Sequence, residues 1–408
     1  MRKIIIFLLI IISFPVFSQD PSFSQSDLGS IYMNPAYTGA SGDPTFLSIR
    51  RMQWNNYNTG GIRPLTTSLA EFSVAIDAGN EGIVGLRTIG IGASFMAEDH
   101  MFIPDLLSNT IFLQRNDYQV YLSGLFKVGK TKSLFKKKSR AIIHYIQPAI
   151  SYGQSIYGLQ TDGIVTSSMI TPYTLSYSGL PDLAINIKDL AIDRKPFHKL
   201  VIGILHSAQG NTNNSKFQRT ESGFVFQRMT EGFNNNPLTS KIIYHIKHQG
   251  SIQDWSSNMI PYWNAFAKRE VYYSGAPFSN KIIAKTEFGG SLELGRYSIL
   301  ELGSLFRFNS DYTDDKFDVN WQSISPFIRC NMRGRRHSYQ LSWCSDLEST
   351  FFTNQKNDLY IKNTGITNEI SLIITFWGGN GPKECIKYGY MKQNGLLQDL
   401  KNNTFLNK

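Results

Sequence analysis

The sequence predicts an all-β protein, a transmembrane antiparallel β-barrel with an irregular N-terminal segment. From residue 46 onward, apolar and polar residues alternate with a period of two, as in a strand with two different faces. Many alternating segments reach roughly 9–11 residues, the length that a tilted strand needs to cross a bilayer. The polar positions include charged residues such as Glu71, Arg307 and Arg329, which suit the wall of a wet lumen.

Composition supports the same class. The chain has 27 Phe, 20 Tyr and 33 Gly, which favours strands joined by many turns. Aromatic residues recur at the ends of expected strands, as in the aromatic girdles of membrane barrels; they are Trp54, Tyr118, Tyr339, Phe376 and Trp377. A soluble exported β-protein stays open as an alternative, although 408 residues are many for one sandwich domain.

Residues 1–18 have the pattern of a signal peptide. Arg2 and Lys3 precede an apolar run, Pro15 breaks it, and cleavage after Ser18 would leave Gln19 first. The apolar run is shorter than the ~20 residues that a membrane-spanning helix needs. We therefore expect export and, for a barrel, insertion into the outer membrane.

Residues 19–45 form the irregular segment, which has neither a helical nor a strand period. Turn-forming residues punctuate it: Pro21, Gly29, Pro35 and Gly39. Three aromatic residues give it something to bury: Phe23, Tyr32 and Tyr37. A disordered N-terminus is one interpretation. Because a barrel follows directly, we favour an ordered segment at the periplasmic mouth or folded into the lumen as a plug.

Eight segments alternate clearly: 46–54, 69–77, 89–98, 118–129, 300–308, 324–333, 339–346 and 370–376. Six weaker strand candidates lie between them: 142–152, 183–187, 200–206, 242–249, 260–266 and 282–288. Segments 210–215, 232–236 and 312–318 are expected to be loops. No linker or repeat divides the chain, which predicts one barrel over residues 46–377 and a C-terminal tail over 378–408.

The formal charge of +10 does not predict a nucleic-acid partner, because the basic residues are scattered and the chain is exported. The densest basic run, 127–140, is expected to be a solvated loop that faces anionic lipopolysaccharide or a partner. Outer-membrane lipid is therefore an expected partner, and nucleic acid is not.

No catalytic, cofactor-binding or metal motif is recognisable, so we expect no enzyme activity. His245 and His248 are three residues apart, which puts them on opposite faces of a strand. Four aspartates, Asp311, Asp314, Asp315 and Asp318, are expected at a solvated hairpin tip. The cysteines, Cys330, Cys344 and Cys385, are too few for a disulfide framework, and the first two are expected on opposite faces.

The end of the first strand holds further candidate residues. By alternation Arg51 and Gln53 face the lumen, and Trp54 is expected to anchor the aromatic girdle. We expect Arg51 to pair with Asp77 or Glu71 on the next strand as a buried ion pair.

Several motifs together resemble the PorP/SprF family of outer-membrane proteins, which are associated with type IX secretion and gliding. The first comprises Gln19, Asp20, Pro21, Phe23, Ser24 and Gln25, and the second comprises Asn34, Pro35, Ala36, Tyr37, Thr38 and Gly39. Weaker matches follow at Arg51-Met52-Gln53-Trp54, at Ala75-Ile76-Asp77, and at Ile89 to Gly92 with Asp99. The chain departs from the family pattern at Ser26-Asp27, Ser30 and Met52.

The resemblance implies a barrel of about 14 strands without catalytic residues. It implies that the protein works with the type IX machinery and helps to secrete or anchor large surface proteins, such as adhesins, through their C-terminal domains. A periplasmic peptidoglycan-binding protein is an implied partner. The matched motif residues would then contact partners or form a plug. A porin-like channel for small polar solutes is the alternative.

Overall fold

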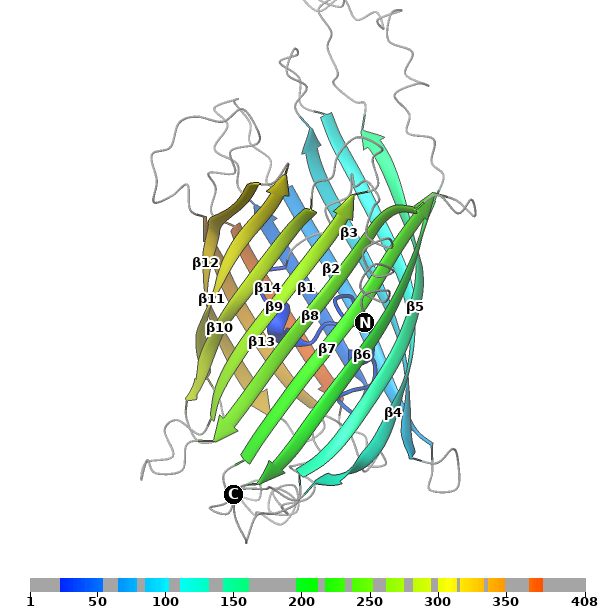
Figure 1. Ribbon diagram of the computed structural model, residues 1–408, viewed down its shortest axis with the longest axis vertical. Coiled ribbons are helices and arrows are strands. Elements are labelled where there is room, and N and C mark those ends of the chain that lie inside the picture. Colours follow the sequence, from blue (N-terminus) through cyan, green and yellow to red (C-terminus); the bar gives the residue numbers. More distant parts are fainter. Residues whose placement is uncertain are drawn as a thin grey trace, which may run out of the picture.

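The fold is a closed barrel of fourteen antiparallel strands (Figure 1). The computed structural model describes residues 23–53, 65–78, 85–102, 111–131, 142–160, 196–211, 217–231, 237–251, 262–274, 282–294, 300–313, 316–333, 337–348 and 367–376. Each strand pairs with its neighbours in sequence, and the first pairs with the last from Thr45↔Thr375 to Gln53↔Thr367.

The strands are β1 (Thr45–Gln53), β2 (Leu65–Asp77), β3 (Leu86–Phe102), β4 (Ile111–Thr131), β5 (Ile142–Gln160), β6 (Phe197–Asn211), β7 (Phe217–Glu231), β8 (Pro237–Ser251), β9 (Tyr262–Ser274), β10 (Ile282–Leu294), β11 (Leu300–Thr313), β12 (Lys316–Arg333), β13 (His337–Glu348) and β14 (Thr367–Phe376). No helix in the described ranges is long and apolar enough to cross a membrane.

The two faces of the barrel wall are inverted relative to a soluble protein. Outward side chains are apolar and exposed; Leu122, Ile202 and Phe224 have 51%, 45% and 46% of their surface exposed. Inward side chains such as Ser151 and Glu369 are polar and buried. Closure pairs the backbone groups along every described strand, which is what lets strands exist in hydrocarbon. This is the fold of an outer-membrane barrel.

The two ends of the barrel differ. β1 begins and β14 ends at the same end, which we call the terminal end. The two longest connections by sequence, between β5 and β6 and between β13 and β14, leave from the other end, the distal end. Because outer-membrane barrels have short periplasmic turns and longer outer loops, the terminal end faces the periplasm.

The segments predicted from the sequence overlap thirteen of the fourteen strands, and all eight clear segments coincide with strands. β7 was missed because its first half, from Phe217 to Gly223, carries polar residues on both faces. The loop expected at 312–318 is wrong, since β11 continues to Thr313 and β12 begins at Lys316. β6 likewise runs into the loop expected at 210–215, and β4 into the basic run at 127–140. The candidates at 183–187 and 232–236 and the C-terminal tail lie outside the described residues.

We predict that a charge placed on the outer face destabilises the folded barrel more at mid-strand than near the distal border. Leu122 lies between the exposed Ile91 and Ile150 of neighbouring strands, whereas Tyr118 lies beside Gln154. Leu122→Lys should therefore destabilise folding into lipid vesicles by about 2–4 kcal/mol, and Tyr118→Lys by about 0–1 kcal/mol. Urea titration of both variants checks this, and equal costs would contradict the assignment of the outer face.

Candidate functional site

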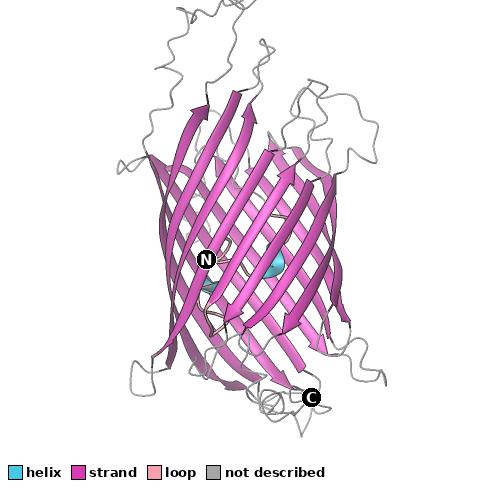
Figure 2. Cartoon of the chain, turned by 180° about the vertical axis from the view of Figure 1, so that it is seen from behind, coloured by secondary structure: helices cyan, strands magenta, loops and turns pink. Residues whose placement is uncertain are grey.

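Residues 23–44 lie inside the barrel, and we call this segment the plug. Figure 2 shows its two short helices within the lumen. They are single 3-10 turns, η1 (Ser26–Leu28) and η2 (Pro35–Tyr37). Most plug side chains are buried, including Phe23, Ile31 and Ala36. The structure thus places residues 23–44 in the lumen.

The second plug turn explains the spacing of the motif that begins at Asn34. The Asn34 side chain accepts a hydrogen bond from the Ala36 N–H at 2.9 Å and caps the turn. Pro35 occupies the first helical position, where its missing N–H costs nothing. The Thr38 hydroxyl donates to the Pro35 carbonyl at 2.7 Å, and Gly39 follows with a φ of 68°. Each motif residue therefore has a local structural task.

Two acidic residues of the wall hold the start of the plug. The backbone N–H groups of Ser24 and Gln25 donate to the Glu369 carboxylate at 2.6 and 3.0 Å. The Ser24 hydroxyl donates to Asp346 at 2.7 Å. The Gln25 side-chain oxygen accepts a hydrogen bond from the Ser342 hydroxyl. These contacts attach the plug to β13 and β14.

The acidic residue of the first turn, Asp27, forms a two-pronged ion pair with Arg329 of β12. Arg329 Nη1 lies 2.8 Å from Asp27 Oδ2, and Nη2 contacts Oδ1. Burial alone would raise the pKa of Asp27, but the Arg329 guanidinium outweighs it and holds that pKa below its ordinary value. Removing either partner would leave the other charge buried, which typically costs about 3–5 kcal/mol.

Glu71 of β2 holds the middle of the plug. Its carboxylate accepts hydrogen bonds from the N–H groups of Ile31 at 3.0 Å and Tyr32 at 2.8 Å, and from the Ser30 hydroxyl. The Tyr32 hydroxyl reaches across to Asp117 of β4 at 2.9 Å. Three successive plug residues thus converge on one wall carboxylate.

The last part of the plug is attached by neutral groups. The Thr38 carbonyl accepts hydrogen bonds from Ser123 Oγ and Gln147 Nε2, both at 2.7 Å. The Tyr37 hydroxyl lies 3.0 Å from His245 Nε2, and the two rings stack. Around the lumen, the plug therefore contacts both halves of the wall.

Glycines in the wall make room for the plug. A Cβ added at Gly90 would lie 2.2 Å from the Thr38 carbonyl oxygen, and one at Gly203 would lie 2.4 Å from Asn34 Oδ1. Neither distance is tolerable for a real side chain. The wall at Gly90 therefore comes close to the plug backbone, an approach that a residue without a Cβ allows.

The remaining luminal charges pair with one another. Arg307 lies 2.8 Å from Asp346 and 3.0 Å from Glu287, and Lys268 continues the chain to Glu287 at 2.9 Å and Glu270 at 3.0 Å. On the other side of the lumen Arg115 pairs with Asp117 at 2.6 Å. These side chains are buried, so the described part of the lumen is filled by side chains and plug.

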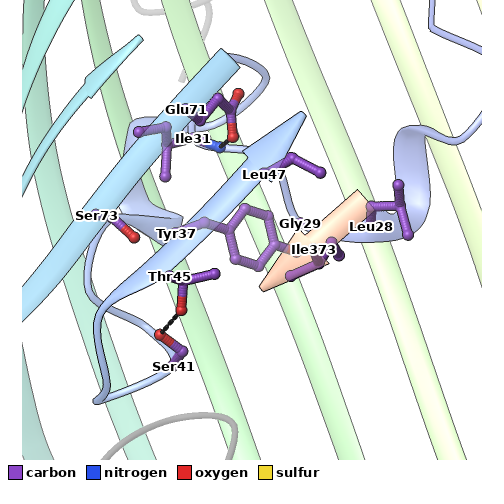
Figure 3. A pocket seen from close by; sticks show the side chains of 10 residues that line it. All are labelled: Leu28, Gly29, Ile31, Tyr37, Ser41, Thr45, Leu47, Glu71, Ser73 and Ile373. Atoms are coloured by element: carbon purple, nitrogen blue, oxygen red, sulfur yellow. Dashed lines mark hydrogen bonds between the residues drawn. The ribbon is translucent and has the colours of Figure 1, made fainter. Parts of the chain in front are cut away.

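A small cavity remains between the plug and strands β1, β2 and β14 (Figure 3). Its volume is about 30 Å³, room for two or three water molecules. Tyr37 and Leu28 of the plug and Leu47 and Glu71 of the wall are among its lining residues. It is too small to pass a solute.

The structure brings together seven of the predicted site residues in the plug: Phe23, Gln25, Asn34, Pro35, Ala36, Tyr37 and Gly39. Gln19, Asp20, Pro21 and Trp54 lie outside the described residues, and Gln53 ends β1.

The partner predicted for Arg51 is wrong. Arg51 faces the lumen, but its guanidinium lies 3.7 Å from Asp346 of β13. The register pairs Arg51 with Thr67, so Asp77 is ten residues further along β2, or about 33 Å at the rise of a strand. The Glu71 carboxylate instead accepts the plug hydrogen bonds.

Sequence reasoning missed the anchors Asp27, Ser30 and Glu369. Asp27 and Ser30 are places where the chain departs from the family pattern, yet each binds the wall directly. Nothing in the segment singled them out, because other polar residues such as Ser24, Gln25 and Asn34 lie around them in the sequence. Glu369 had the alternation signal of a luminal charge, but nothing local identified its partners.

Within the described ranges, no group of three or more residues could hold a metal ion. His245 faces the lumen, whereas His248 lies against Trp263 on the outer face, as the spacing predicted. Cys330 and Cys344 are free, and only Cys344 is buried. Of the four aspartates, Asp311 and Asp318 pair across the β11–β12 hairpin, and the other two lie outside the described residues.

No family model and no curated protein matches the chain. Among solved structures it is similar to the transport unit of the autotransporter AIDA-I from Escherichia coli, at 8% identity and a TM-score of 0.37, over 82% of this chain and 90% of that one. A FadL homologue from Pseudomonas aeruginosa matches at 9% identity and 0.37, over 88% and 98%. A mutant of the monoaromatic hydrocarbon channel TodX matches at 8% and 0.39, over 85% and 93%. The likeness concerns the barrel fold alone.

We predict that Gly90→Ala disturbs the plug, because the added methyl group would overlap the Thr38 carbonyl. Overpacking of this kind costs about 1–3 kcal/mol. Gly129→Ala is the matched control, since a Cβ there meets nothing within 4 Å. Thermal unfolding and protease sensitivity of the plug should change in the first variant only. Identical behaviour of the two variants would argue against docking of Thr38 on this wall.

We predict that Glu71→Ala loosens the middle of the plug, because it leaves two buried N–H groups without their acceptor. Each such group costs about 1–3 kcal/mol. Hydrogen exchange at Ile31 and Tyr32 should accelerate, while the β-strand amides stay protected. Ser68→Ala, an exposed outward position on the same strand, is the control. Unchanged exchange at both amides would exclude Glu71 as the anchor.

Proposed function

We propose that the chain is an outer-membrane barrel of the PorP/SprF type that serves the type IX secretion and gliding apparatus. In this proposal it helps to secrete or anchor large surface proteins through their C-terminal domains. One observation supports it most: motif residues that resemble the family, from Phe23 to Gly39, build an ordered plug in the lumen. Such a plug gives the motif a structural purpose in this chain.

The closed lumen suits a scaffold. An anchoring protein needs a stable wall and surfaces at its two ends, and it needs no open path between them. Here the plug and the paired charges occupy the lumen among the described residues, and the cavity beside β1, β2 and β14 is only about 30 Å³. In our proposal the distal end meets the secreted surface protein, and the terminal end meets a peptidoglycan-binding periplasmic protein.

The second candidate function is a channel for small polar solutes. The observation in its favour is that the plug is attached by hydrogen bonds and ion pairs, which can be broken without cleaving the chain. A channel would require the plug to leave the wall, and a scaffold would not.

Deletion of the gene tests the first function. Surface adhesins should then be lost from intact cells and gliding should stop, while total adhesin synthesis continues. Complementation by the wild type and by Gly129→Ala should restore both, and detergent-solubilised outer membrane should yield the barrel together with its cargo. Normal adhesin display and motility in the deletion strain would overturn the proposal.

Planar-bilayer conductance separates the two functions. We predict almost no conductance for the wild-type barrel and clear openings for a variant that lacks residues 23–40, because that deletion removes the groups that fill the lumen. Large, stable conductance of the wild type would favour the channel.

A further inference from the structure

Two of the described arginines are exposed on the outer face of the barrel wall. Arg50 of β1 and Arg269 of β9 are exposed, and each lies between inward-facing neighbours on its strand. Across the outer face, Arg50 is flanked by Ser68 and Ile370. Arg269 is flanked by Tyr244 and Thr286. Neither flank offers a carboxylate, and neither arginine forms an ion pair or hydrogen bond with another described residue.

Both arginines lie in the distal part of their strands. Arg50 is five residues above Thr45, and Arg269 is seven above Tyr262, or roughly 17 and 23 Å along strands that both begin at the terminal end. With the lower edge of the apolar band taken at the start of these strands, a strand tilt of about 40° puts the two positions about 13 and 18 Å up a band about 25 Å tall, at or above its middle. An arginine side chain can reach the headgroup region from there.

Tyrosines on the outer face support this placement. Tyr244, directly opposite Arg269, is 51% exposed, and Tyr118 and Tyr152 are 50% and 43% exposed. Tyrosine gathers where hydrocarbon meets headgroups, because its ring is apolar and its hydroxyl is polar. The arginines therefore accompany the distal aromatic border.

A guanidinium on this face needs an anion, and the described residues around Arg50 and Arg269 provide none. Its aliphatic stem can lie along the apolar wall while its charged end reaches the headgroup layer. Arginine holds phosphate through two parallel hydrogen bonds, which a lysine ammonium cannot reproduce. The anions at this level of an outer leaflet are lipid phosphates.

We propose that Arg50 and Arg269 bind the phosphate groups of lipopolysaccharide, at its phosphorylated glucosamine headgroup. The two sites lie on β1 and β9, well separated around the barrel, so each holds its own lipid molecule. These lipids would fix the depth and tilt of the barrel in the outer leaflet. This binding is independent of cargo and of the plug.

The test uses the purified full-length barrel in detergent, titrated with bisphosphorylated lipid A and with dephosphorylated lipid A. Bound lipid is counted by native mass spectrometry, and the thermal midpoint is followed in parallel. Arg50→Ala/Arg269→Ala should lower the apparent affinity for bisphosphorylated lipid A by at least about tenfold. Arg50→Lys/Arg269→Lys should bind with intermediate affinity. Gln218→Ala, an exposed outward residue near the terminal end, should bind like the wild type.

The wild type should bind dephosphorylated lipid A as weakly as the double alanine variant binds the phosphorylated form. Equal affinity of the wild type and the double alanine variant would overturn the proposal. Equal binding of the two lipids would also overturn it, because acyl chains alone would then account for retention. A variant that keeps its lipid but loses a co-purifying protein would identify these arginines as a protein contact instead.

Discussion

Buried carboxylates need hydrogen-bond donors or cations, and this constraint organises the interior of the barrel. The luminal wall carries Glu71, Asp346 and Glu369, of which at most 4% of the surface is exposed. Wall arginines form ion pairs with some of these carboxylates, as Arg307 does with Asp346. The plug donates hydrogen bonds to Glu369 and Glu71 from its backbone N–H groups. These N–H groups are available because the irregular plug does not pair them within a helix or sheet. Wall and plug therefore complete each other.

The same constraint explains which parts of the structure the sequence could predict. Alternation is a local property, so the outward and inward faces of most strands could be assigned from the sequence. The luminal orientation of Arg51 and Glu71 was among these assignments. β7 was not predicted because its first half carries polar residues on both faces, Thr220 and Glu221 among them, so apolar and polar residues do not alternate there. The loop expected at 312–318 was wrong for a related reason, because a polar hairpin can still form a ladder, as the pairs Tyr312↔Phe317 and Thr313↔Lys316 show.

Partners across the lumen could not be predicted, because they depend on register and on the path of the plug. Arg51 is an example, since its luminal orientation was predicted correctly but its partner was not. The register places Asp77 at the far end of β2, and the Arg51 guanidinium lies 3.7 Å from Asp346 of β13. Asp27 shows it again, since its partner Arg329 is 302 residues away in sequence. Within the plug, by contrast, the turn at Asn34 and Pro35 is local, and the proline was its signal in the sequence.

The plug also bears on how the barrel closes. β1 and β14 form the seam and, at 9 and 10 residues, are the two shortest strands in the described chain. The plug runs directly into β1, and the Phe376 N–H donates to the Pro44 carbonyl at 2.9 Å, which extends the seam ladder by one bond. At its other end, the plug binds Glu369 of β14. One continuous segment is thus covalently joined to one side of the seam and hydrogen-bonded to the other. A force that withdraws the plug therefore acts on the β1–β14 seam, so plug position and barrel closure are mechanically coupled.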